Sequence, residues 1–209
     1  MEITIVFLLG FVFAFLGVIP PGLLNMTAAK ISLKEGHVRG LMFSIGACAV
    51  VVAQTYLAAI FASYLSQHPE VVDVLRRVAV VIFILITIYF LFIAKSKQPK
   101  QVEPKIRSKH SRFFQGILLS ALNVFPIPYQ GYITIMLASY GWMTFERLDI
   151  ISYVAGSVMG TFVVLYLYVF FFEKIHSKTL TSQKNMNRII GGITLIIAII
   201  TLINIIFKD

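Results

Sequence analysis

Long apolar runs recur along the chain, and short polar connections separate them. A helix needs roughly 20 apolar residues to cross the ~30 Å core of a bilayer. Runs of this length without alternation are typical of membrane helices and not of strands. The pattern predicts an all-α polytopic membrane protein with six spans, at residues 3–31, 40–65, 73–94, 112–139, 148–172 and 187–207.

The first run contains a break, Pro20-Pro21-Gly22, followed by Asn25. Proline has no N–H, and Pro21 disfavours the α conformation at Pro20. Backbone groups that a break exposes at membrane depth must face protein or a water-filled cavity. The stretch is therefore a candidate binding site.

The fourth run contains a comparable break, at Asn123 and Pro126-Ile127-Pro128. When Gly10 is placed over Gly116, Pro20 falls on Pro126. This correspondence predicts two repeats, at about residues 3–94 and 112–207, joined by a basic linker at 95–111 within a single transmembrane domain, 1–209. Because each repeat has three spans, the second must be inverted. Paired broken helices near the midplane are typical of transporter binding sites.

The composition agrees with a membrane protein, since 58% of the residues are hydrophobic and the mean hydropathy is +0.88. The net charge of +9 does not indicate nucleic-acid binding, because the basic residues lie between apolar runs. Fourteen of the 18 Lys and Arg residues lie in connections on one side of the predicted membrane. The positive-inside rule then places both termini outside a bacterial-type cytoplasmic membrane.

No acidic residue and no histidine is deep in a predicted span, so neutral substrates fit better than basic ones. Exposed half-helix N-termini at the breaks favour a carboxylate. The candidate substrate-binding residues are Pro20, Pro21, Gly22, Asn25, Gln54, Asn123, Pro126, Pro128, Tyr129 and Gln130. We expect no metal site, no cofactor and no enzymatic activity, because the spans offer no nucleophile with a base and no ligand cluster.

Two of these residues, and one further feature of the sequence, have two interpretations each. Asn25 is either an N-cap of the resumed helix or a ligand, and Gln54 either bridges helices or binds substrate. A face of small residues at Ser152, Gly156 and Gly160 serves close packing within the chain or, alternatively, a homo-oligomer interface.

Several segments resemble the LysE/RhtB family of amino-acid exporters. The stretch Pro20 to Met26 resembles its N-terminal P-G-P-N-type motif, and residues 33–40 resemble its basic, glycine-containing loop. Leu122 to Pro126 resembles its mid-chain L-L-N-P motif. The resemblance implies a secondary transporter that exports amino acids, driven by protons or the membrane potential. The alternatives are a membrane assembly protein without transport activity, and a transporter of another small solute or of a metal ion.

Overall fold

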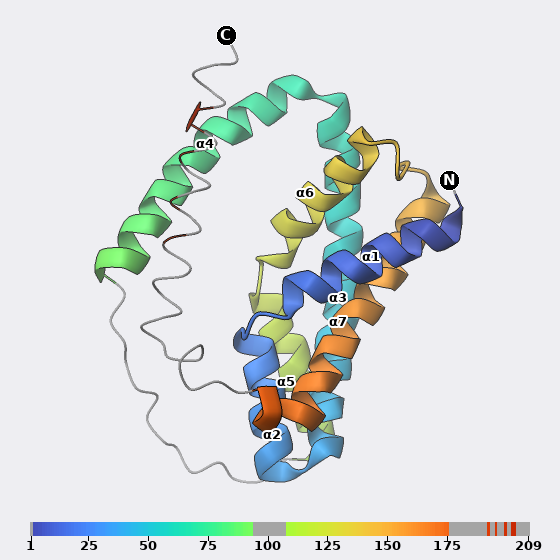
Figure 1. Ribbon diagram of the computed structural model, residues 1–209, viewed down its shortest axis with the longest axis vertical. Coiled ribbons are helices and arrows are strands. Elements are labelled where there is room, and N and C mark those ends of the chain that lie inside the picture. The colour runs from blue at the N-terminus through green and yellow to red at the C-terminus, as the bar shows by residue number, and fades with distance from the viewer. Residues whose placement is uncertain are drawn as a thin grey trace. The chain divides into compact units, whose positions relative to one another are not determined.

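The computed structural model describes residues 2–93 and 108–175, with five more near the C-terminus. Every regular element in these ranges is helical (Figure 1). The elements are α1 (Ile3–Val18), α2 (Leu23–Glu35), α3 (His37–Gln67), α4 (Pro69–Ile88), the π-helical turn η1 (Tyr89–Ile93), α5 (Lys109–Leu122), α6 (Pro126–Ser139) and α7 (Arg147–Ile175). Apart from those five residues, the predicted sixth span lies outside the described residues, as does most of the basic linker.

The helix lengths fit a polytopic membrane protein. Among the described residues, α3 and α7 are each long and apolar enough to cross a bilayer. The pair α1 and α2 passes the same test jointly, with a bend of 75° between its halves. The first predicted span is therefore broken where the prolines stand, and the fourth is likewise divided into α5 and α6.

The chain forms two compact units, one comprising Met1–Ser66 with Pro104–Ile175 and the other Gln67–Glu103 with His176–Asp209. The first unit contains the candidate site. In it, α1 and α6 lie toward one end of α3, and α2 and α5 lie toward the other (Figure 1). The second unit contains α4 and η1, which together correspond to the third predicted span, residues 73–94.

Three apolar clusters occur in the first unit, and two of them lie toward opposite ends of α3. Val6 of α1, Ile133 and Leu137 of α6, and Tyr153 of α7 belong to one cluster. The other consists of Leu24, Ala28, Ile31, Phe43, Ala47, Cys48, Leu165 and Val169, from α2, α3 and α7. Each broken helix thus contributes one half to each end of the bundle, and the breaks lie between.

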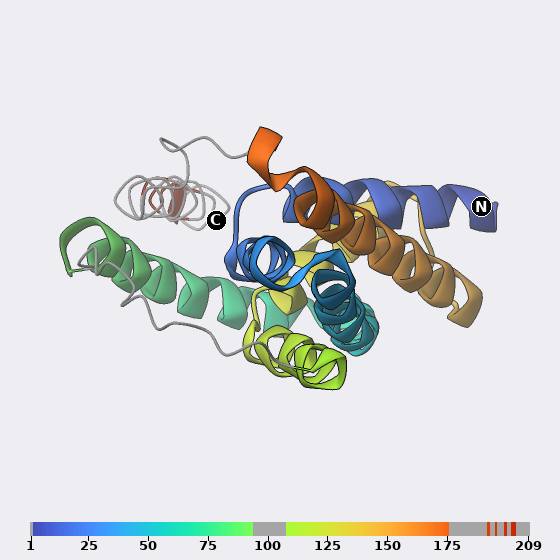
Figure 2. The same ribbon diagram turned by 90° about the horizontal axis from the view of Figure 1, so that it is seen from below.

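Glycines allow two helix pairs to approach to backbone contact. A Cβ at Gly156 of α7 would lie 2.0 Å from the carbonyl oxygen of Phe7, and one at Gly10 of α1 would lie 2.4 Å from that of Tyr153. Figures 1 and 2 both show α1 lying across α7. In the second pair, a Cβ at Gly46 of α3 would lie 2.1 Å from the Phe113 oxygen.

In both pairs a glycine of each helix faces a backbone oxygen of the other helix, and α5 supplies the second glycine of the α3–α5 contact. A Cβ at Gly116 would lie 2.1 Å from the carbonyl oxygen of Phe43. We call the two contacts the α1–α7 seam and the α3–α5 seam.

The small-residue face of α7 is occupied within the chain. Gly156 and Gly160 contact the α1 backbone, and the Ser152 hydroxyl donates a hydrogen bond of 2.7 Å to the Ile3 carbonyl. The interpretation as packing within the chain is therefore confirmed. The alternative homo-oligomer interface is wrong for this face, because α1 covers it.

Candidate functional site

At the first break, between α1 and α2, the Asn25 side chain holds the carbonyl groups that the end of α1 exposes. Its amide nitrogen donates to the Val18 oxygen at 2.6 Å and to the Pro20 oxygen at 3.0 Å. The prolines cannot supply backbone donors here. Asn25 is 4% exposed, and its amide thus closes the bend from inside. The N-cap interpretation of Asn25 is wrong, because Gly22 occupies that position.

A tyrosine from α7 completes the first break. The Tyr168 hydroxyl donates a hydrogen bond of 2.8 Å to the carbonyl oxygen of Ile19. Asn25 and Tyr168 together bond the carbonyl groups of three consecutive residues, Val18 to Pro20. Sequence reasoning missed Tyr168, although a hydroxyl in an apolar span must find a partner.

The start of α2 is uncapped by side chains. Gly22 is extended (φ −121°, ψ −177°), and no side chain caps the helix there. The first backbone bond of this turn joins the Met26 N–H to the Gly22 oxygen at 3.0 Å. The N–H groups of Leu23, Leu24 and Asn25 have no intrahelical acceptor. The helix dipole adds partial positive charge at the same place, which favours an anionic group.

At the second break, between α5 and α6, a side chain from α3 acts in the same way. The Gln54 amide nitrogen donates to the carbonyl oxygen of Ser120 at 3.0 Å and to that of Asn123 at 2.9 Å. Gln54 is 5% exposed. Its interpretation as a bridge between helices is confirmed, and its two acceptors are backbone carbonyl groups at the C-terminal end of α5.

Tyr129 brings the two breaks together. It lies in the first turn of α6, and its hydroxyl donates a bond of 2.8 Å to the Phe13 carbonyl of α1. Its ring packs on Gly17, one residue before the end of α1, where a Cβ would lie 2.8 Å from the ring. The end of α1 and the start of α6 therefore border one region.

The other candidate residues are less enclosed, apart from Gln130. Gln130 is buried, and its side-chain oxygen accepts a bond of 2.5 Å from the Tyr153 hydroxyl. Pro126 begins α6 and is half-buried, as are Pro21 and Asn123, whereas Pro20 and Pro128 are exposed. The predicted residues thus lie at the breaks or bond to groups there, except Gln130, which lies one turn into α6 and bonds to Tyr153 of α7.

A buried ion pair lies at the end of the bundle formed by α2 and α5. Arg112 binds the Glu35 carboxylate through two nitrogens, with Nε 2.9 Å from Oε2, and it also donates to Gln115. The side chains of Arg112 and Glu35 are 8% and 2% exposed. The pair connects the half-helix after the first break to the half-helix before the second. Sequence reasoning placed both residues at span ends but did not predict their pairing.

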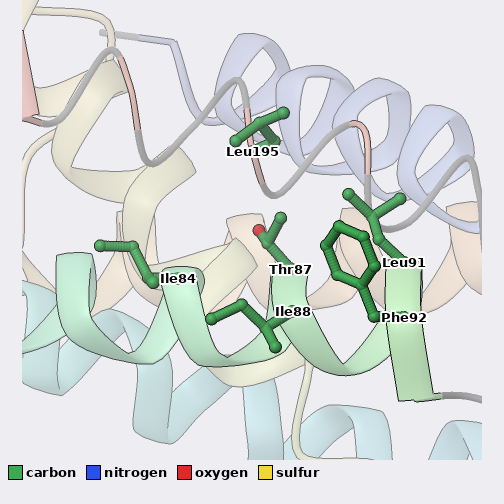
Figure 3. A pocket seen from close by; sticks show the side chains of 6 residues that line it. All are labelled: Ile84, Thr87, Ile88, Leu91, Phe92 and Leu195. Atoms are coloured by element: carbon green, nitrogen blue, oxygen red, sulfur yellow. The ribbon is translucent and has the colours of Figure 1, made fainter.

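Two apolar cavities occur elsewhere. One of about 320 Å³ belongs to the second unit (Figure 3) and is lined by Ile84, Thr87, Ile88, Leu91, Phe92 and Leu195. The other, of about 370 Å³, lies between the first turns of α1 and α7. Neither is lined by a residue of the breaks. Among the described residues, no group of three or more His, Cys, Asp or Glu side chains could hold a metal ion.

Apolar spans and paired broken helices with buried amides fit a polytopic membrane protein, and such breaks are typical of transporter binding sites. A comparison with protein families matches residues 7–204 to the LysE type translocator model. The protein therefore belongs to the LysE family, whose members move amino acids or related solutes across membranes. Neither the curated proteins nor the solved structures gave a match.

Proposed function

We propose that the protein exports neutral amino acids across the cytoplasmic membrane. The observation that carries this proposal is the uncapped start of α2, held in place by Asn25. Free N–H groups and the positive dipole end suit a carboxylate. No carboxylate or ammonium side chain of the described residues bonds at either break, so a substrate with a charged side chain would find no counter-charge there.

We further propose that the chain is an inverted repeat of two three-helix halves. The two glycine seams support this. Gly10 corresponds to Gly116 and Gly46 to Gly156, and the contacts are exchanged accordingly. The breaks follow the same rule, since Tyr168 of α7 bonds at the first and Gln54 of α3 at the second. Each broken helix is thus supported by the second span of the other half.

In this arrangement the breaks lie near the bilayer midplane and the ten candidate residues surround the substrate. The basic connections face the cytoplasm, so the Glu35–Arg112 pair lies at the inner end and both termini lie outside. Thiol labelling of single cysteines tests the orientation. Reaction of Ser96→Cys with an impermeant reagent added outside intact cells, without reaction of Gln67→Cys, would reverse it.

Export itself is tested in proteoliposomes by counterflow of labelled amino acids, with Pro20-Pro21 replaced by Ala-Ala as the site variant. Uptake of neutral amino acids by the native protein is expected to exceed that of lysine and to be lost in the variant. A driving force is identified by imposing a pH gradient or a membrane potential separately. Undiminished counterflow in the variant contradicts the site, and absence of counterflow for every amino acid contradicts the function.

A further inference from the structure

The second break contains buried oxygen atoms without hydrogen-bond partners. Within the described ranges, three buried side-chain atoms lack a partner: Gln54 Oε1, Thr55 Oγ1 and Ser120 Oγ. Gln54 is 5% exposed, and Thr55 and Ser120 are fully buried. Buried polar groups are almost always hydrogen-bonded. Three exceptions, on two consecutive α3 residues and on an α5 residue that Gln54 bonds, call for a partner that the fold itself does not supply.

The three residues are connected along α3 and from α3 to the end of α5. Gln54 and Thr55 are consecutive on α3, and the Gln54 amide nitrogen bonds to the backbone oxygen of Ser120 itself. Because the same amide also donates to Asn123, its orientation is fixed and Oε1 remains as an acceptor. The two hydroxyls add further acceptor positions.

The electrostatics of the second break favour a cation. It lies at the C-terminal end of α5, where the helix dipole places partial negative charge. The start of α6 supplies little to oppose it, since Pro126 and Pro128 have no N–H and the Ile127 N–H bonds to the Val124 oxygen at 3.2 Å. The second break thus offers acceptors, whereas the first offers the N–H donors of α2.

A primary ammonium group matches this set, because it carries a positive charge and three donors and accepts no hydrogen bond. A zwitterionic amino acid has such a group beside its carboxylate. Tyr129 joins the two breaks by contacting Gly17 and the Phe13 carbonyl. The donors of the first break and the acceptors of the second thus match the carboxylate and the ammonium group of a zwitterion in chemistry.

We propose that Gln54 Oε1 and the hydroxyls of Thr55 and Ser120 form the subsite for the α-ammonium group of the substrate. This rests on the proposed export of amino acids, and it adds that the protein selects against carboxylic acids lacking an amino group. The same oxygen ligands would also suit a sodium ion, and the experiment separates the two.

The test compares an exported amino acid with its des-amino carboxylic acid as competitors of counterflow in proteoliposomes. The variants are Ser120→Ala and Thr55→Val, which remove the unpartnered hydroxyls at little change of shape. Either should weaken inhibition by the amino acid about tenfold, corresponding to about 1.4 kcal/mol. Inhibition by the des-amino acid should stay within about twofold.

The unfolding temperature of these variants should be unchanged or higher, because the hydroxyls that they lose have no partner in the fold. Ser44→Ala is the matched control. Its hydroxyl is also buried but bonds to the Gly40 carbonyl at 3.0 Å, away from the breaks. It should change neither inhibition constant, which would show that the effect belongs to the subsite.

Equal weakening for both competitors, or lower stability without a change in selectivity, would overturn the proposal. Repeating the assay with sodium replaced by choline provides the second arm. If Ser120→Ala changes the sodium dependence and not the preference for the amino group, the subsite binds sodium and the ammonium proposal is wrong. If the native protein moves no amino acid, the proposed function fails as well.

Discussion

The two helix breaks solve one structural problem with different chemistry. Each has carbonyl groups near the end of a half-helix to which a buried side-chain amide donates. At the first break this amide comes from Asn25, in the segment that follows the break. At the second it comes from Gln54, on a different helix.

The surroundings of the breaks differ in polarity. The first break precedes a helix start whose N–H groups no side chain caps. The second precedes a start in which Pro126 and Pro128 lack the N–H, and it has unpartnered oxygens beside it. Breaks that correspond in sequence therefore provide a donor region and an acceptor region, as a zwitterion requires. Substitutions in the contacts that hold both broken helices, and then in those specific to one break, test this comparison.

The largest effect is expected at the ion pair that joins the two broken helices. Arg112→Met removes the guanidinium that binds the buried Glu35 carboxylate and should destabilise the fold by about 3–5 kcal/mol. Adding Glu35→Gln should recover most of the loss, because the buried charge is then removed. Denaturant unfolding in detergent measures both. Arg147→Met, at an exposed position, is the control, and equal stability of Arg112→Met and this control would contradict the assignment.

The next largest losses of stability are expected at the glycines of the two seams. Gly46→Ala and Gly156→Ala each place a Cβ about 2 Å from a backbone oxygen of the facing helix. Each should destabilise the fold by about 2–3 kcal/mol through overpacking. Gly131→Ala is the matched control, because its Cβ would lie 3.8 Å from the nearest neighbour, the Ala58 carbonyl oxygen. Losses that differ severalfold between the seams in unfolding experiments would contradict their equivalence.

Removal of the side-chain amides of Gln54 and Asn25 should cost different amounts of stability at the two breaks. Gln54→Leu leaves the carbonyl groups of Ser120 and Asn123 without this donor and should cost about 2 kcal/mol. Asn25→Leu should cost about 1 kcal/mol, because Tyr168 still bonds at the first break and Pro20 is exposed. The measurement is denaturant unfolding in detergent. A larger loss for Asn25→Leu would reverse this order.

The smallest effects are expected at two tyrosines. Tyr168→Phe removes a donor to Ile19, which lies past the end of α1, and should cost about 1 kcal/mol. Tyr129→Phe should cost about 0.5 kcal/mol, because the Phe13 carbonyl is inside α1 and retains its helical hydrogen bond. Shifts in thermal unfolding, with exposed Tyr132→Phe as the control, would show this order. Equal shifts would indicate that the first break does not depend on Tyr168.

Local chemistry explains what could be predicted from sequence. The breaks at Pro20-Pro21 and Pro126 follow from proline's missing N–H, and the bridge from Gln54 follows from the need to satisfy an amide in an apolar span. The packing of Gly156 was also foreseeable from the spacing of small residues along one helix face.

The contacts of the site that could not be predicted depend on which helices become neighbours in the fold. The N-cap interpretation of Asn25 is wrong because its hydrogen-bond partners lie before the break, across the 75° bend. Tyr168 and the Glu35–Arg112 pair join residues far apart in the chain, and no local pattern encodes those contacts. The same holds for the unpartnered oxygens, which are recognised only once burial is known.

The proposed site requires that both breaks contact one substrate molecule. Protection from thiol labelling tests it most directly, in a Cys48→Ala background that leaves one introduced cysteine. Gly22→Cys reports on the first break and Asn123→Cys on the second, since both positions are half-buried. We predict that a neutral amino acid slows labelling at both positions with the same half-maximal concentration. Protection at only one break, or at neither, would contradict the account.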